Sequence, residues 1–132
     1  MSVECRLYVG LTLELKRNLN SADFSRLSGF VEKYPELDEY AYHDTDKEGK
    51  LLLIGDGMNG DFLRLIYVDK FIDGGSLGDS NEFIELLAPT AIMPARCYDK
   101  ELIEKMADIY EEYTDTRPAI SDFRYAIWSQ WY

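Results

Sequence analysis

Apolar and polar residues alternate strictly over the first part of the chain. The apolar positions, each two residues apart, are Val3, Cys5, Leu7, Val9, Leu11, Leu13 and Leu15. A period of two is typical of a β-strand, whose side chains point alternately to its two faces. The pattern predicts a long strand over residues 3–15 with one buried face and one face exposed to water.

Two other segments have the spacing of amphipathic helices. The first follows a cap-forming sequence at residues 20–23 and ends before Pro35, and the second begins after Asp99 and runs over residues 100–114. Asn and Asp accept hydrogen bonds from the free amides of a first helical turn, and proline stops a helix. The predicted apolar stripes are Phe24, Leu27, Val31 and Tyr34 in the first helix, and Leu102, Met106, Ile109 and Tyr113 in the second.

The remaining segments predict a hairpin, loops and a last strand. Residues 51–55 and 62–69 are apolar and flank an Asn59-Gly60 turn signal. Residues 36–50 are polar and predict a loop with a short strand near 40–43, and residues 74–78 predict another loop. Residues 83–93 fit either two strands or a short helix, and residues 119–131 alternate as a final strand.

The predicted fold follows from this order of strand, helix, hairpin, helix and strand. It is typical of an α+β domain with a ferredoxin-like βαββαβ antiparallel sheet, two helices on one face and an irregular insert near 74–98. The length of 132 residues predicts a single domain, 1–132. In the last strand, Trp128, Gln130 and Tyr132 are expected opposite Phe123 and Ile127. There they form a candidate contact surface or homodimer interface, and packing in the core or against the insert is the equal alternative.

Composition restricts the class of protein. With 46% hydrophobic residues the chain can form a core, and its apolar runs are far shorter than the roughly 20 residues that span a bilayer. The first residues lack a signal-peptide pattern, so we expect a cytoplasmic protein that does not bind membranes. In that compartment Cys5 and Cys97 are expected to be reduced.

The charge is distributed unevenly. The net charge is −11, and residues 32–115 hold 21 acidic and eight basic residues, a local net charge of −13. The two flanking segments each carry +1. A block of negative charge this large indicates a basic partner and disfavours direct binding of nucleic acid, because phosphates would be repelled.

Three motifs are candidates for chemistry, and each has a simpler interpretation. Residues 44–51 resemble the first half of a calcium-binding loop, but Gly55 stands where the last chelating acid is needed. The glycine-rich residues 74–80 lack the lysine of a phosphate-binding loop. His43 next to Asp44 could act as a base, but no activated nucleophile accompanies it. These motifs predict no cofactor and no metal site.

The second predicted helix carries the candidate partner-binding site. Glu104, Asp108, Glu111 and Asp115 share its polar face at spacings of about 4.5–6 Å along the axis, comparable to the spacing of phosphates along a DNA strand. The full candidate set is Glu101, Glu104, Asp108, Tyr110, Glu111, Glu112 and Asp115. A solvated helix face that serves only solubility is the alternative interpretation.

These features favour a non-enzymatic acidic inhibitor that occupies the basic, nucleic-acid-binding site of a partner such as a nuclease. In size and charge the chain resembles anti-CRISPR and other phage anti-defence proteins and immunity proteins against nuclease toxins. Two alternatives stay open. One is a small metal- or ligand-dependent enzyme with its site at His43, Asp44, Asp56 and Asp61, and the other is a self-assembling structural domain.

Overall fold

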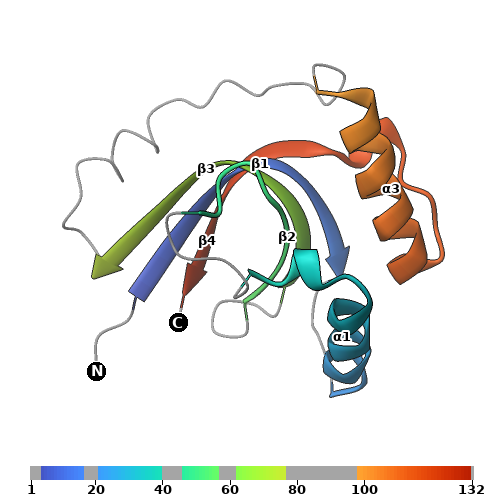
Figure 1. Ribbon diagram of the computed structural model, residues 1–132, viewed down its shortest axis with the longest axis horizontal. Helices are drawn as coiled ribbons and strands as arrows, with labels where there is room; N and C mark the ends of the chain where they lie inside the picture. Colours follow the sequence, from blue (N-terminus) through green and yellow to red (C-terminus); the bar gives the residue numbers. More distant parts are fainter. Residues whose placement is uncertain (1–3, 17–20, 40–45, 57–61, 77–97, 132) are drawn as a thin grey trace.

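The computed structural model describes residues 4–16, 21–39, 46–56, 62–76 and 98–131 (Figure 1). The described residues form a four-stranded antiparallel sheet of order β2-β3-β1-β4 and two α-helices, so the α+β prediction is confirmed. The specific ferredoxin-like arrangement stays a prediction. In chain order the elements are β1 (Glu4–Lys16), α1 (Ser21–Lys33), the 3-10 turn η1 (Pro35–Leu37), β2 (Leu51–Asp56), β3 (Phe62–Ser76), α3 (Lys100–Thr114), the 3-10 turn η4 (Ile120–Asp122) and β4 (Arg124–Trp131).

Some predicted boundaries were wrong. β3 continues to Ser76, because residues 74–76 extend its pairing with β1 instead of forming a loop. The last strand begins at Arg124, since η4 occupies part of the segment expected to be strand. The short strand expected at 40–43, the Asn59-Gly60 turn and the remainder of the insert at 77–97 lie outside the described residues.

Both helices begin or end for the reasons given by the sequence. α1 ends just before Pro35, and the backbone amide of Tyr34 donates to the carbonyl of Phe30 at 3.0 Å. At the start of α3, the Asp99 side chain accepts a hydrogen bond from the Glu101 amide at 2.9 Å. Within the described residues, neither helix has the length and apolar character needed to cross a bilayer.

The main core lies between the sheet and both helices. In Figure 1 the sheet is strongly curved, and α1 and α3 lie on its convex side. Phe30 of α1 meets Tyr113 of α3 edge to face, with ring centroids 5.5 Å apart. The sheet contributes alternate residues of β1, as the periodicity predicted: Leu11, Leu13 and Leu15.

The expectation that the other face of β1 is exposed to water was wrong. Tyr8 is fully buried and Thr12 is 4% exposed. The concave side of the curved sheet closes over a second apolar cluster, in which Tyr8 packs with Leu52, Ile54, Ile66 and Val68. Lys47, expected in a solvated loop, is also buried there, and its Nζ donates to the Tyr8 hydroxyl oxygen at 3.4 Å.

The pairing of β1 with β3 shifts in register at three points, and one of these is a bulge at Asp69, which bends the strand locally. Val9 and Gly10 pair with Lys70 and Val68, so Asp69 is an extra residue in β3. Gly10 approaches the bulge so closely that a Cβ built on it would lie 1.8 Å from the carbonyl oxygen of Tyr67. The bend therefore requires glycine at position 10.

The bulge also anchors the start of α3. The Tyr98 hydroxyl donates to Asp69 Oδ2 at 2.7 Å, and the Tyr98 ring contacts Tyr67 and Tyr125. Burial, with the hydrogen bond to Asp69, raises the pKa of Tyr98. Burial and the nearby Asp69 carboxylate raise the pKa of Tyr125 in the same way. The Tyr98 hydroxyl therefore ties the residue that precedes the Asp99 cap of α3 to the bulge in β3.

Candidate functional site

α3 is fixed to the core along one face and presents the opposite face to solvent. Met106, Ile109 and Tyr113 are buried, as their spacing predicted. The predicted carboxylates lie on the remaining surface, where Glu101, Glu104, Asp108, Glu111, Glu112 and Asp115 are all exposed. Tyr110 is half-buried. The structure therefore brings the six predicted carboxylates together on the solvent-facing side of α3 and its C-terminal end, whereas Tyr110 packs toward the core.

Arg117 neutralises part of this row. Its Nη1 lies 2.5 Å from Asp108 Oδ1 and 3.2 Å from Glu111 Oε2. The hydrogen bonds to Asp108 and Glu111 raise the pKa of the guanidinium. The sequence indicated only Lys100 and Lys105 as nearby bases. Arg117 was missed because it lies beyond the end of α3 and reaches the helix only after the chain turns back.

Glu112 connects α3 to α1. It accepts hydrogen bonds from Lys33 Nζ and from the Tyr34 hydroxyl. These two bonds lower the pKa of the Glu112 carboxyl, and the same contact raises the pKa of Lys33 and of Tyr34. This carboxylate therefore contributes to the packing of the helices.

Three carboxylates of the row have no such partner in the described part of the chain. Among the described residues, no cation forms an ion pair with Glu101, Glu104 or Asp115. Asp115 follows the helix in a left-handed conformation with φ 62°. The last turn of α3 contains no base, although the helix dipole favours cations at that end.

Most of the alternative enzyme site cannot be placed. His43, Asp44 and Asp61 lie outside the described residues, and Asp56 is the last residue of β2. No group of three His, Cys, Asp or Glu side chains in the described part of the chain is placed to hold a metal ion.

The described part of the calcium-like motif forms a turn that leads into β2. Asp46 is exposed, and Glu48 Oε1 accepts from the Phe71 amide at 3.2 Å. Gly49 has a φ of 77°, and its amide donates to the Val68 carbonyl at 2.7 Å. The glycine of the calcium-like motif is therefore explained by the positive φ of this turn.

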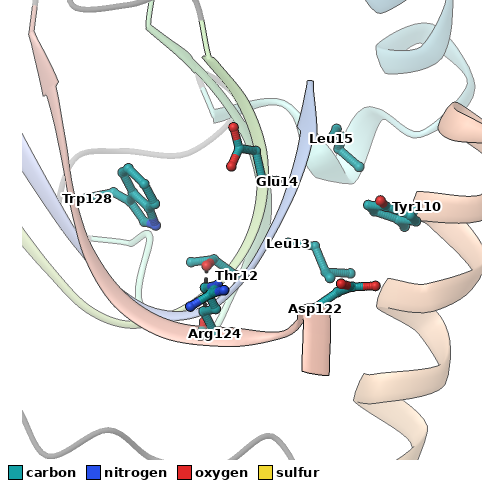
Figure 2. Close-up of a pocket in the computed structure, with 8 residues that line it drawn as sticks. All are labelled: Thr12, Leu13, Glu14, Leu15, Tyr110, Asp122, Arg124 and Trp128. Carbon is teal, nitrogen blue, oxygen red and sulfur yellow. Dashed lines mark hydrogen bonds between the residues drawn. The ribbon is translucent and has the colours of Figure 1, made fainter. Parts of the chain in front are cut away.

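The structure also reveals a pocket that the sequence did not predict. It has a volume of about 380 Å³ and lies where β1, β4, η4 and α3 meet (Figure 2). Its lining residues are Thr12, Leu13, Glu14, Leu15, Tyr110, Asp122, Arg124 and Trp128. Tyr110 belongs both to this lining and to the candidate set on α3, so the pocket adjoins the acidic helix.

The two sides of the pocket differ in chemistry. Figure 2 shows Leu13, Leu15 and Tyr110 toward α3, and Glu14 and Trp128 on the opposite side of the strand. The guanidinium of Arg64, a buried residue of β3, lies over the Trp128 ring. At the β4 end, the Thr12 hydroxyl donates to the Arg124 carbonyl at 3.0 Å. The side toward α3 is thus apolar apart from Asp122, whose Oδ2 accepts from the Ala119 amide at 2.8 Å. The other side combines an aromatic ring with a carboxylate.

Comparison with known proteins gives no further assignment. No protein-family model matches the chain, and no curated protein or solved structure is found to match it.

Proposed function

We propose that the protein is a non-enzymatic, cytoplasmic binding protein whose acidic α3 surface occupies a basic site on a partner protein. The partner class that fits this surface best is a nuclease or another nucleic-acid-binding protein, whose phosphate-binding groove is rich in Lys and Arg. The observation that carries the proposal is the row of exposed carboxylates on a helix that its opposite face fixes to the core.

A second feature supports the proposal. Glu111, Glu112 and Asp115 lie near the C-terminal end of α3, where negative charge opposes the helix dipole, and Asp115 adopts a conformation that favours glycine. Arg117 and Lys33 compensate Glu111 and Glu112, whereas Asp115 forms no ion pair with a described cation. Residues that break local rules in this way are concentrated at functional sites.

The ion pairs decide which residues to test. Substituting Asp108 or Glu111 would also release Arg117, so a loss of binding would have two explanations. Glu101 and Glu104 are exposed and hold no described cation, which makes them the cleaner choice.

The test compares two double variants of equal net charge. Glu101→Lys with Glu104→Lys reverses the α3 surface, and Glu32→Lys with Asp46→Lys reverses two exposed acids elsewhere. Immobilised wild type is expected to retain a basic nucleic-acid-binding protein from a host lysate. The α3 variant is expected to retain at least about tenfold less of this protein, and the control variant should retain nearly as much as wild type. High salt should elute the captured protein, because salt screens the charges that hold it.

Two results would contradict the proposal. Equal loss in both variants would mean that net charge alone, and not the α3 surface, is responsible. Retention that ignores both the α3 substitutions and the salt concentration would exclude an electrostatic contact on this helix.

A further inference from the structure

Within the part of the chain that the structure describes, one edge of β1 has no neighbouring strand beyond the start of β4. The pairing of β1 with β4 stops at Thr12 and Arg124. On the other edge, β3 pairs with β1 as far as Lys16 and Leu63, with a shift of register between Glu14 and Lys16. Over residues 13–16, the backbone edge toward β4 therefore has no described neighbouring strand. An edge of this kind can accept an added strand through backbone hydrogen bonds.

The pocket lies along this open edge. Four consecutive residues, 12–15, line it. Because successive side chains of a strand point to opposite faces, consecutive residues can line one pocket only from the edge of the strand. Figure 2 shows this division, with Leu15 and Glu14 on opposite sides of β1. The shape therefore fits an extended peptide that continues in the place of β4.

The lining determines which side chains such a peptide needs. Glu14 lies opposite Arg64 of β3 in the register of the sheet. A peptide residue paired with Glu14 from the other side would place its side chain beside the same carboxylate, where a Lys or Arg continues the alternation of charge across the strands. Its neighbours along the peptide would point to the other face, against Leu15 and Tyr110, where an aliphatic side chain fits. Arg124 lies at the β4 end, so the cation belongs opposite Glu14 and not at that end.

Charge also distinguishes between a partner and a second copy of this chain. Two copies joined at this edge would each bring a net charge of −11. A basic segment is attracted by the same field.

We infer that the open β1 edge over residues 13–16 docks an extended segment of a basic partner protein, with alternating basic and aliphatic side chains, as an added strand. This inference rests on the proposed function, since it names the second contact of the same partner.

The probe is a short capped peptide of alternating Val and Lys, with an otherwise identical peptide in which Glu replaces Lys. Two further versions carry N-methyl groups on alternate amides of the Lys peptide. A strand pairs through one edge only, so one methylated version is expected to lose at least about tenfold in affinity while the other retains it. The Lys peptide is also expected to slow hydrogen exchange at some of the amides of residues 13–16.

A matched pair of variants tests the side-chain contact. Glu14→Gln removes the carboxylate in the pocket and is expected to weaken binding of the Lys peptide several-fold. Glu104→Gln makes the same change of charge on α3, outside the pocket, and should have a smaller effect. Circular dichroism checks that both variants fold, and the exchange measurement on wild type does not depend on either.

Several outcomes would overturn the inference. They are no binding of the Lys peptide, equal binding of both methylated versions, or protection that avoids residues 13–16. Concentration-dependent protection of these amides without peptide would make a second copy the occupant and would also overturn it. If the α3 charge reversal abolishes partner capture, but the peptide tests show no binding at residues 13–16, only this inference is wrong and the proposed function stands. If the edge binds the peptide but capture ignores α3, the proposed function fails.

Discussion

Gly10 is the residue at which the curvature of the sheet depends most directly on one side chain. A methyl group at this position would overlap the Tyr67 carbonyl oxygen and approach the Asp69 amide at 3.2 Å. These atoms belong to the backbone of β3, a central strand, so they cannot move aside without disturbing the bulge. Since the bulge bends the sheet around its concave cluster, this contact influences both faces of the sheet.

We therefore expect Gly10→Ala to lower the free energy of unfolding by about 2–4 kcal/mol, at or above the upper end of the usual cost of overpacking. Gly29 supplies a matched control, because a Cβ there meets nothing within 4 Å and the residue lies in α1. Gly29→Ala should raise stability by about 0.5–1 kcal/mol through helix propensity. Urea denaturation of both variants measures this, and an unchanged midpoint for Gly10→Ala would contradict it.

At the scale of elements, the contact between α1 and α3 depends on pH. The pKa of Glu112 is lowered by Lys33 and Tyr34, so its contribution to stability is present above the ordinary value of 4.5 and is lost as pH falls through the lowered pKa. The pKa values of Lys33 and Tyr34 are raised from 10.5 and 10.0. Their contribution is present below those values and is lost as pH rises through the raised pKa.

Glu112→Gln should therefore reduce the loss of stability below pH 4.5 relative to wild type. Glu104→Gln, on the same helix without a described ion pair, should leave that part of the profile closer to wild type. Because the pair is exposed, the difference should be small and should shrink in high salt. Free energies of unfolding from pH 2 to 7 measure it, and identical acid profiles for Glu112→Gln and wild type would show that the ion pair does not stabilise the fold.

The elements that the sequence predicted well are those specified by local signals. The period of β1, the Asp99 cap and stripe of α3, and the stop of α1 before Pro35 all depend on residues close together in the chain. The failures involve contacts between distant segments. Tyr8 is buried by side chains of β2 and β3, and Lys47 is buried because its turn folds into the concave face.

The candidate site divides in the same way. Helical spacing was sufficient to place the carboxylates of α3 on one surface, but the partners of Asp108, Glu111 and Glu112 come from beyond the helix. The pocket could not be predicted, because it exists only where β4 leaves β1 after Thr12. Local periodicity contains no information about where a strand loses its neighbour.

At the scale of the whole molecule, the charge and the pocket should control different rates of binding. The net charge of −11 acts over distance and accelerates encounter with a basic ligand, whereas contacts in the pocket act only after docking. Raising the ionic strength from about 0.01 to 0.1 M shortens the Debye length from about 30 to 10 Å. We expect the association rate constant of the Lys peptide to fall about tenfold over this range, with a smaller change in its dissociation rate constant.

Variants should separate the two contributions. Glu101→Lys with Glu104→Lys should mainly slow association, because these side chains are exposed on α3 and do not line the pocket. Glu14→Gln should mainly accelerate dissociation, since it removes the carboxylate paired with the bound lysine. Stopped-flow fluorescence with a labelled peptide measures both rate constants. Two results would contradict this separation: a salt effect mainly on dissociation, or a Glu14→Gln variant that associates as slowly as the α3 variant. In either case, long-range attraction of the peptide and its contacts after binding would both have to come from one surface, and not from α3 and the strand edge separately.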